Sequence, residues 1–348
     1  MGGDVCEQSA VPGKSKRNAS VEVFRCLMMF SVVFWHCWSH GIYQEANASW
    51  MLLFALLYWH VDGFLVISGW YSIRFSWRKF ISLYSQILFY SILSFAYLKA
   101  TGQNAHFTVT GGWFGGTYLM LLLIVPLLNL AVETLSKRSK QDIWRIWGLF
   151  ALAMFLSWAP RHLYTSVEPF DMETFGFLDG TIVMMAFVYV TVRLFRLLDL
   201  KLSKRLMFAG VCLFVLCTIG IGMVISFCHT RTFSEWSSYR IYCSFAAPHF
   251  VLMAIVAFVF FKDYVRIPKW LERGVIFLSP SMFGVYLFHD TTSFCRVYLI
   301  QIEEWLSGSM SALPTMICSA MIVFAISVCV DLVRRLIFFL TKRCVGVA

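Results

Sequence analysis

The sequence predicts an all-α integral membrane protein, a ten-span helical bundle with its N-terminus and C-terminus in the cytoplasm. Three observations predict this: the composition, ten apolar stretches and the distribution of basic residues. Of the 348 residues, 59% are hydrophobic and only 14% are charged, whereas soluble domains carry about 25% charged residues. The length suits one bundle without a large soluble domain.

Ten apolar stretches approach the roughly 20 residues that a helix needs to cross the hydrocarbon core. They occupy residues 21–41, 51–73, 80–98, 114–133, 144–160, 177–195, 206–228, 242–262, 274–292 and 310–340. The last is long, and we expect its cytoplasmic end to lie along the interface. We therefore divide the chain into a cytoplasmic tail (1–19), a ten-span domain (20–343) and a cytoplasmic end (344–348).

The first stretch follows a polar, basic tail, and no small-residue cleavage signature follows it. We expect a retained anchor rather than a cleaved signal peptide. Of the 29 Lys and Arg residues, 23 fall in alternate segments, beginning with the N-terminal tail. An excess of basic residues in alternate loops marks the cytoplasmic side. The N-terminus is thus expected inside, and with an even number of spans so is the C-terminus.

The same basic residues explain the net charge of +10 as an orientation signal, so no nucleic-acid partner is expected. The eleven cysteines contain no C-x-x-C pair, and most lie inside apolar stretches. Free cysteines commonly pack as small hydrophobic residues. We expect neither a disulfide framework nor a metal site.

Ionisable residues inside the stretches are the candidates for function, because each costs about 2.5–3.5 kcal/mol to insert at mid-helix. They are Glu22, Arg25, His36 and His40 in the first stretch, His60 and Asp62 in the second, His249 in the eighth, and His289 and Asp290 in the ninth.

In the first stretch these residues share one helical face. Arg25 and His36 are eleven residues apart, which places them within about 20° of each other around the helix and roughly 16 Å apart along it. Glu22 lies one turn before Arg25, and His40 one turn after His36. Such a stripe must face protein or water. Alternatively, Glu22 and Arg25 pair and extend to the cytoplasmic surface while His36 only packs.

The second stretch runs in the opposite direction, which places His60 and Asp62 near mid-membrane. Asp62 is able to orient a histidine and fix its tautomer, as partners of general bases do. Ser68 and Gly69 reach about the depth of Arg25. Alternatively, Gly63 and Gly69 permit close helix packing and Asp62 pairs with a neighbouring span.

A buried histidine three turns from an arginine suggests that the two side chains have separate roles in acyl transfer. The histidine would take a proton from an attacking hydroxyl, and the guanidinium would bind the phosphates of a donor arriving from the cytoplasm. Taken alone, the same residue types also fit the relay of a proton-coupled transporter.

Four segments resemble one family. VEVFRCLMMFSVVFWHCWSHG (21–41) contains the R-x10-H pattern that is typical of the acyltransferase family 3 membrane proteins. FLVISGWYS (64–72), YLMLLLIVPLLN (118–129) and SPSMFGVYLFHD (279–290) are similar to further elements of that family, in the same order. The chain departs from the family pattern at Trp35 and Trp70, where histidine and tyrosine are usual.

This resemblance implies a bacterial plasma-membrane enzyme that moves an acyl group, most often acetyl, from acyl-CoA to a hydroxyl of a cell-surface carbohydrate or its lipid-linked precursor. It implies His36 as the catalytic histidine and Arg25 as its partner near the donor. Acyl-CoA is a substrate, so no permanently bound cofactor is expected, and the partners are the donor, the carbohydrate acceptor and the lipid bilayer.

We assign the remaining candidates to two groups. The supporting group is Glu22, His40, His60, Asp62, His289 and Asp290. The donor-binding group is Ser68, Gly69, Arg74, Arg78 and Lys79. The basic cluster at 74–79 equally suits anionic lipid head groups, and His289 equally suits an ordinary interfacial position. Alternative functions are a proton-coupled exporter or flippase of surface-polymer precursors, and a non-catalytic scaffold, against which the intact Arg25–His36 pair argues.

Overall fold

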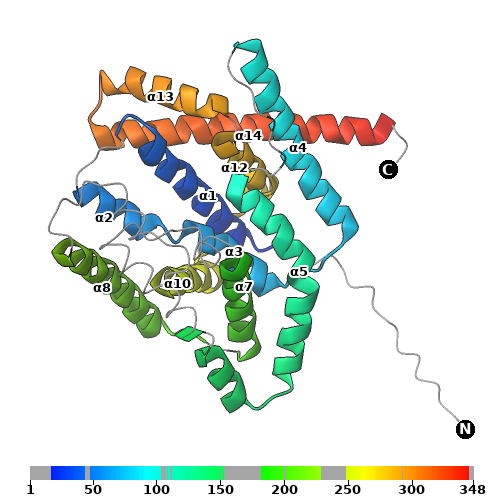
Figure 1. Ribbon diagram of the computed structural model, residues 1–348, viewed down its shortest axis with the longest axis vertical. Coiled ribbons are helices and arrows are strands. Elements are labelled where there is room, and N and C mark those ends of the chain that lie inside the picture. Colours follow the sequence, from blue (N-terminus) through cyan, green and yellow to red (C-terminus); the bar gives the residue numbers. More distant parts are fainter. Residues whose placement is uncertain are drawn as a thin grey trace, which may run out of the picture.

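The computed structural model describes residues 17–43, 48–102, 107, 109, 112–149, 151–152, 182–199, 201–228, 248–291 and 293–344, and every regular element in this part is helical. The labelled α-helices are α1 (Ala19–His40), α2 (Ala48–Leu57), α3 (His60–Tyr71), α4 (Trp77–Ala100), α5 (Gly112–Ser136), α7 (Ile182–Leu197), α8 (Lys204–Cys228), α10 (Pro248–Tyr264), α11 (Lys269–Leu278), α12 (Met282–Thr291), α13 (Ser293–Ser307) and α14 (Ala312–Cys344), with a 3₁₀ turn, η2 (Ser279–Ser281), between α11 and α12 (Figure 1).

The all-α prediction is confirmed. Five helical segments among the described residues are long and apolar enough to cross a membrane: Ala19–His40, Leu53–Tyr71, Trp77–Ala100, Gly112–Ser136 and Ala312–Thr341. The predicted stretches 144–160, 177–195 and 242–262 run partly outside the described residues, as do most of the tail 1–19 and the end 344–348. Ten spans and their orientation therefore remain a prediction.

Two stretches that were expected to be continuous helices are broken. The stretch 51–73 divides into α2 and α3, with Tyr58 and Trp59 between them. The stretch 274–292 divides into α11 and α12 at η2, which contains Pro280. Proline has no backbone N–H to continue the helical pattern. Broken helices inside membranes are tolerated where they line a cavity, and both breaks adjoin the cavity described below.

The α1 helix is the centre of the bundle, where it contacts α3, α10, α11, α12 and α14. Its first turn is capped by Asn18, whose side chain accepts a hydrogen bond of 2.9 Å from the Ser20 N–H. Its side chains enter both large hydrophobic clusters: Phe24 belongs to one, Val33 and Trp38 belong to the other, and all three are fully buried. Of the polar groups on α1, Glu22 and Ser39 are buried by this packing.

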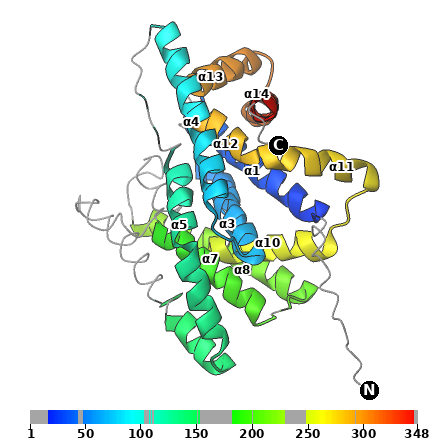
Figure 2. The same cartoon turned by 90° about the vertical axis from the view of Figure 1, so that its right-hand side faces the viewer.

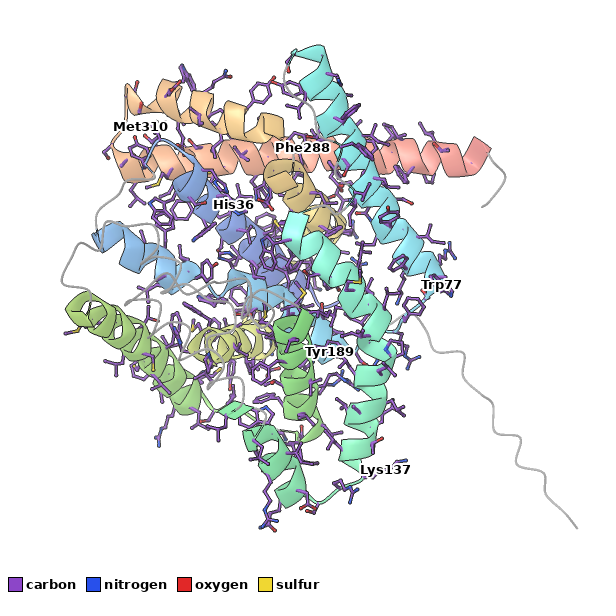
Figure 3. The ribbon with its side chains drawn as sticks, viewed as in Figure 1. His36, Trp77, Lys137, Tyr189, Phe288 and Met310 are labelled. Atoms are coloured by element: carbon purple, nitrogen blue, oxygen red, sulfur yellow. The ribbon has the colours of Figure 1, made fainter. Side chains whose placement is uncertain are left out.

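Two labelled residues mark opposite sides of the bundle. Trp77, at the start of α4, and Met310, just before α14, lie on opposite sides of the molecule, with His36 between them (Figure 3). In Figure 2, α14 is seen end-on whereas α11 lies across the view. The α11 helix therefore runs at a steep angle to α14, on the side where α14 ends.

A buried polar network, which the sequence analysis overlooked, fastens α4 to α14. Tyr90 donates a hydrogen bond of 2.9 Å to Asp331, and Arg334 donates one of 2.7 Å to the same carboxylate oxygen. Asp331 is fully buried and Arg334 is 5% exposed, although Arg334 is one of the 23 basic residues counted above in alternate segments. Gly284 of α12 leaves the space for this carboxylate, since a Cβ there would lie 1.9 Å from the Asp331 oxygen.

We predict that Gly284→Ala destabilises the fold strongly. The new methyl group forces Asp331 away from its partners, and disrupting a buried ion pair costs about 3–5 kcal/mol. The melting temperature of the detergent-purified protein measures the effect. It is obtained by heating samples and quantifying the folded fraction by size-exclusion chromatography. Gly274→Ala on α11 is the matched control, because a Cβ there meets nothing within 4 Å. Equal melting temperatures for the two variants would contradict the prediction.

Candidate active site

A cavity of about 330 Å³ lies among α1, α3, α4, α5, η2 and α12. Arg25 and His36 both line it, so it follows α1 over the roughly 16 Å between these residues. Most of its wall is apolar and aromatic, including Trp35, Phe64 and Phe114. A long, apolar cavity with a few polar groups is the usual form of a small-molecule site.

A chain of two hydrogen bonds orients His36. The Nδ1 atom of His289 lies 2.6 Å from the Val285 carbonyl oxygen of its own helix. Its Nε2 atom lies 2.9 Å from Nδ1 of His36. The three groups thus connect the α12 backbone to the cavity-lining histidine of α1.

The chain fixes the tautomers of both rings. A carbonyl oxygen only accepts hydrogen bonds, so the proton of His289 resides on Nδ1. With both rings neutral, His289 Nε2 carries a lone pair, and His36 Nδ1–H donates to it. We therefore assign a lone pair to His36 Nε2. Its nearest charged neighbour is Asp290, with an oxygen 3.7 Å from Nε2, so an imidazolium formed at His36 would be stabilised.

His40 completes this group at the end of α1. Its ring stacks on that of His36, with centroids 5.3 Å apart and planes inclined by 27°. Ligand atoms of His36, His40 and Asp290 lie within 4.8 Å of one another, so a small contraction would let them bind a metal ion. Such an ion would occupy the lone pair of His36 and compete with a role for that nitrogen as a base.

His60 also lines the cavity. Its Nδ1 atom lies 2.8 Å from the Leu57 carbonyl oxygen, across the break between α2 and α3. The same argument gives the neutral ring a lone pair on Nε2, so it is able to accept a hydrogen bond from a ligand. Asp62 is fully buried, and neither of its oxygens has a hydrogen-bond partner among the described residues. The partner that orients His36 is His289, not Asp62.

At the other end of the cavity, Arg25 pairs with Glu22 at 3.4 Å. The Arg25 side chain is 30% exposed, so its guanidinium is accessible as well as paired. Ser68 lines the cavity nearby and lies 3.2 Å from the Tyr118 hydroxyl. Gly69 faces α7 instead, where a Cβ would lie 2.9 Å from the Tyr189 carbonyl oxygen.

The predicted basic cluster lies outside the cavity, around the start of α4. Lys79 and Arg78 are exposed, and the Lys79 ammonium donates a hydrogen bond of 3.4 Å to the Arg74 carbonyl. Sequence reasoning missed most of the aromatic wall, including Tyr58, Trp113 and Tyr286. Tyr286 lies in a segment quoted for the family resemblance, which was the available signal.

Glu303 of α13 fastens the end of α1 just beyond His40. Its carboxylate accepts a hydrogen bond of 2.8 Å from the Ile42 N–H, and the residue is fully buried. Burial raises the pKa of the Glu303 carboxyl from 4.5 to about 7, although the bond from Ile42 acts in the opposite direction.

This raised pKa predicts a pH-dependent stability. The folded state holds the proton of Glu303 more tightly than the unfolded state does. The resulting contribution to stability is complete below pH 4.5 and is lost as the pH rises through about 7. Glu303→Gln removes the titration. We expect the melting temperature of Glu303→Gln to rise relative to that of the wild type as the pH increases from 4.5 to 7. Above this range the difference should remain constant. Melting curves that move in parallel over this range would contradict the prediction.

Comparison with known proteins identifies the family of the chain. A family model described as an acyltransferase domain matches residues 18–334, which include α1 with both Arg25 and His36 and extend into α14. No curated protein and no solved structure matches the chain significantly. Because the family model covers most of the sequence, the chain belongs to acyltransferase family 3 and is an acyltransferase.

Proposed function

We propose that this acyltransferase moves an acyl group from acyl-CoA to a hydroxyl of a cell-surface carbohydrate or its lipid-linked precursor. The observation that carries the proposal is that Arg25 and the oriented His36 line one cavity. A donor that binds its phosphates near Arg25 reaches His36 with the thioester end of its thin pantetheine arm. The volume of 330 Å³ is small for a ligand pocket, for which about 300–1,000 Å³ is usual, and this favours acetyl as the acyl group.

The proposed reaction uses His36 as a general base. Its Nε2 lone pair takes the proton of the acceptor hydroxyl as that oxygen attacks the thioester carbonyl carbon. The carbon–sulfur bond then breaks, and the proton on His36 passes to the departing CoA thiolate. Asp290 stabilises the transient imidazolium, and His289 accepts the hydrogen bond from His36 Nδ1–H, which leaves the lone pair of His36 on Nε2. No metal ion takes part.

The acceptor would reach the cavity from the other side. Trp113 lines the cavity and is 42% exposed, so it presents an aromatic face on which a sugar ring is able to stack. With the ten-span topology, the donor arrives from the cytoplasm and the acceptor from the opposite face. The proposed location is the bacterial plasma membrane.

We predict that His36→Ala abolishes acyl transfer. Removal of a general base typically costs about 10²–10⁴-fold in rate. The purified protein in nanodiscs is given labelled acetyl-CoA and a crude extract of surface glycans, and incorporation of the label is measured. His249→Ala is the matched control, because His249 does not line the cavity; it should retain most of the activity.

Three outcomes separate the alternatives. Label incorporated by the wild type and the control but not by His36→Ala supports the proposal, provided that all three proteins elute as folded monodisperse species. Equal incorporation by wild type and His36→Ala would rule out His36 as the base. If the wild type neither binds nor consumes acetyl-CoA but moves glycan precursors in response to a proton gradient, the proposal fails in favour of transport.

We predict that His289→Phe lowers kcat by about 100-fold and leaves KM for acetyl-CoA within a factor of about two. Phenylalanine preserves the ring volume but removes the acceptor for His36 Nδ1–H, so the base loses its fixed tautomer. Steady-state kinetics separates the two constants. A rise in KM that accounts for the whole loss would show that His289 acts on donor binding instead.

A further inference from the structure

A second cavity adjoins the first at the side where α14 ends. It is an open groove of about 630 Å³ between α4, α11 and α14. Pro280 lines both the groove and the first cavity. On α4, Ser82 lines the groove and the neighbouring Leu83 lines the cavity. The groove therefore lies directly against the cavity, with Pro280 in the wall that they share.

The groove contains a cation without an acidic partner. Among the described residues, no carboxylate lies within salt-bridge distance of Arg335, whereas Arg334 is paired with Asp331. Arg335 donates two hydrogen bonds of 3.0 Å, to the Phe277 carbonyl and to the Ser281 hydroxyl, and both come from Nη1. Its Nη2 and Nε atoms remain for a ligand, and a guanidinium edge matches phosphate oxygens.

Further polar and aromatic groups line the same groove. Ser82 and Gln86 contribute from α4, and Arg78 precedes Ser82 by four residues, which places it on the same helical face. Phe277 and Phe339 line the groove from α11 and α14, with exposed fractions of 56% and 55%. Exposed aromatic rings beside arginines suit a planar base that is attached to phosphates.

We propose that this groove binds the nucleotide half of the acyl donor, with phosphate on Arg335 and Arg78 and the adenine ring against Phe277 or Phe339. This inference rests on the proposed function. CoA carries its adenine and phosphates at one end of the pantetheine arm, so that end requires a site next to the mouth of the cavity. An anionic lipid offers the same phosphate chemistry, but it does not require a groove that lies against the cavity.

Binding of CoA and of adenosine 3′,5′-bisphosphate to the protein in phosphatidylcholine nanodiscs tests the assignment by calorimetry. We expect Arg335→Gln to bind both ligands about tenfold more weakly, because a charged hydrogen bond is lost. Ser82→Trp is designed to fill the groove while leaving the hydrogen bonds of Arg335 in place. It should also weaken the binding of both ligands. The matched control is Arg145→Gln, whose side chain is 67% exposed and far from the groove residues in sequence; it should bind as the wild type does.

A truncated donor separates the groove from the catalytic cavity. S-acetylpantetheine lacks the nucleotide, so wild type and Arg335→Gln should use it with equal kcat/KM, whereas acetyl-CoA should show the tenfold difference. A general structural defect would lower the use of both donors and would overturn the assignment.

The remaining outcomes distinguish this inference from the proposed function. If the wild type transfers acetyl from acetyl-CoA but Arg335→Gln and Ser82→Trp bind CoA normally, the function stands and the groove assignment fails. If both variants lose bisphosphate binding but the wild type transfers no acyl group, the groove assignment stands and the function fails. Co-purification of phosphatidylglycerol with the wild type but not with Arg335→Gln, with unchanged CoA affinity, would assign the groove to a lipid and overturn the proposal.

Discussion

The arrangement of the site depends on the need of buried polar groups for hydrogen-bond partners, since burial without them is costly. His289 meets this requirement through the Val285 carbonyl, and His36 meets it through His289. Because the carbonyl only accepts, both protons are fixed in direction, and the remaining lone pair of the neutral His36 belongs to Nε2. The reactivity of one nitrogen on α1 thus follows from one carbonyl group on α12.

The breaks in two helices both contribute residues to the wall of the cavity that His36 lines. Between α2 and α3, the break frees the Leu57 carbonyl to bind His60. At η2, which contains Pro280, the chain passes from α11 to α12 (Figure 2), and this proline lines both the cavity and the groove. Gly284 and the Asp331 network then fix α12 against α14. Backbone irregularity, usually unfavourable in a membrane, here occurs where it lines internal space.

The sequence predicted the helices and the pairing of residues along one helix, because both depend on local composition and on the helical repeat. The Glu22–Arg25 pair and the contact of His36 with His40 follow from spacings of three and four residues. Contacts between distant segments were harder to predict. His289 was selected as a supporting residue, but its direct bond to His36 spans 253 residues, and no pattern fixes which face of α12 turns toward α1. The breaks, the Asp331 network and the groove were missed for the same reason.

The tautomers assigned to His36 and His289 are tested most directly by ¹⁵N NMR of the histidine rings in the membrane-reconstituted protein. The chain has eight histidines, and spectra of His36→Gln and His289→Gln assign the two signals of interest. We expect both rings to be neutral, with the proton on Nδ1 and a lone pair on Nε2. A proton on Nε2 of His36, whether in the other neutral tautomer or opposite a charged His289, would contradict this expectation, because that nitrogen would have no lone pair with which to accept the proton of a hydroxyl.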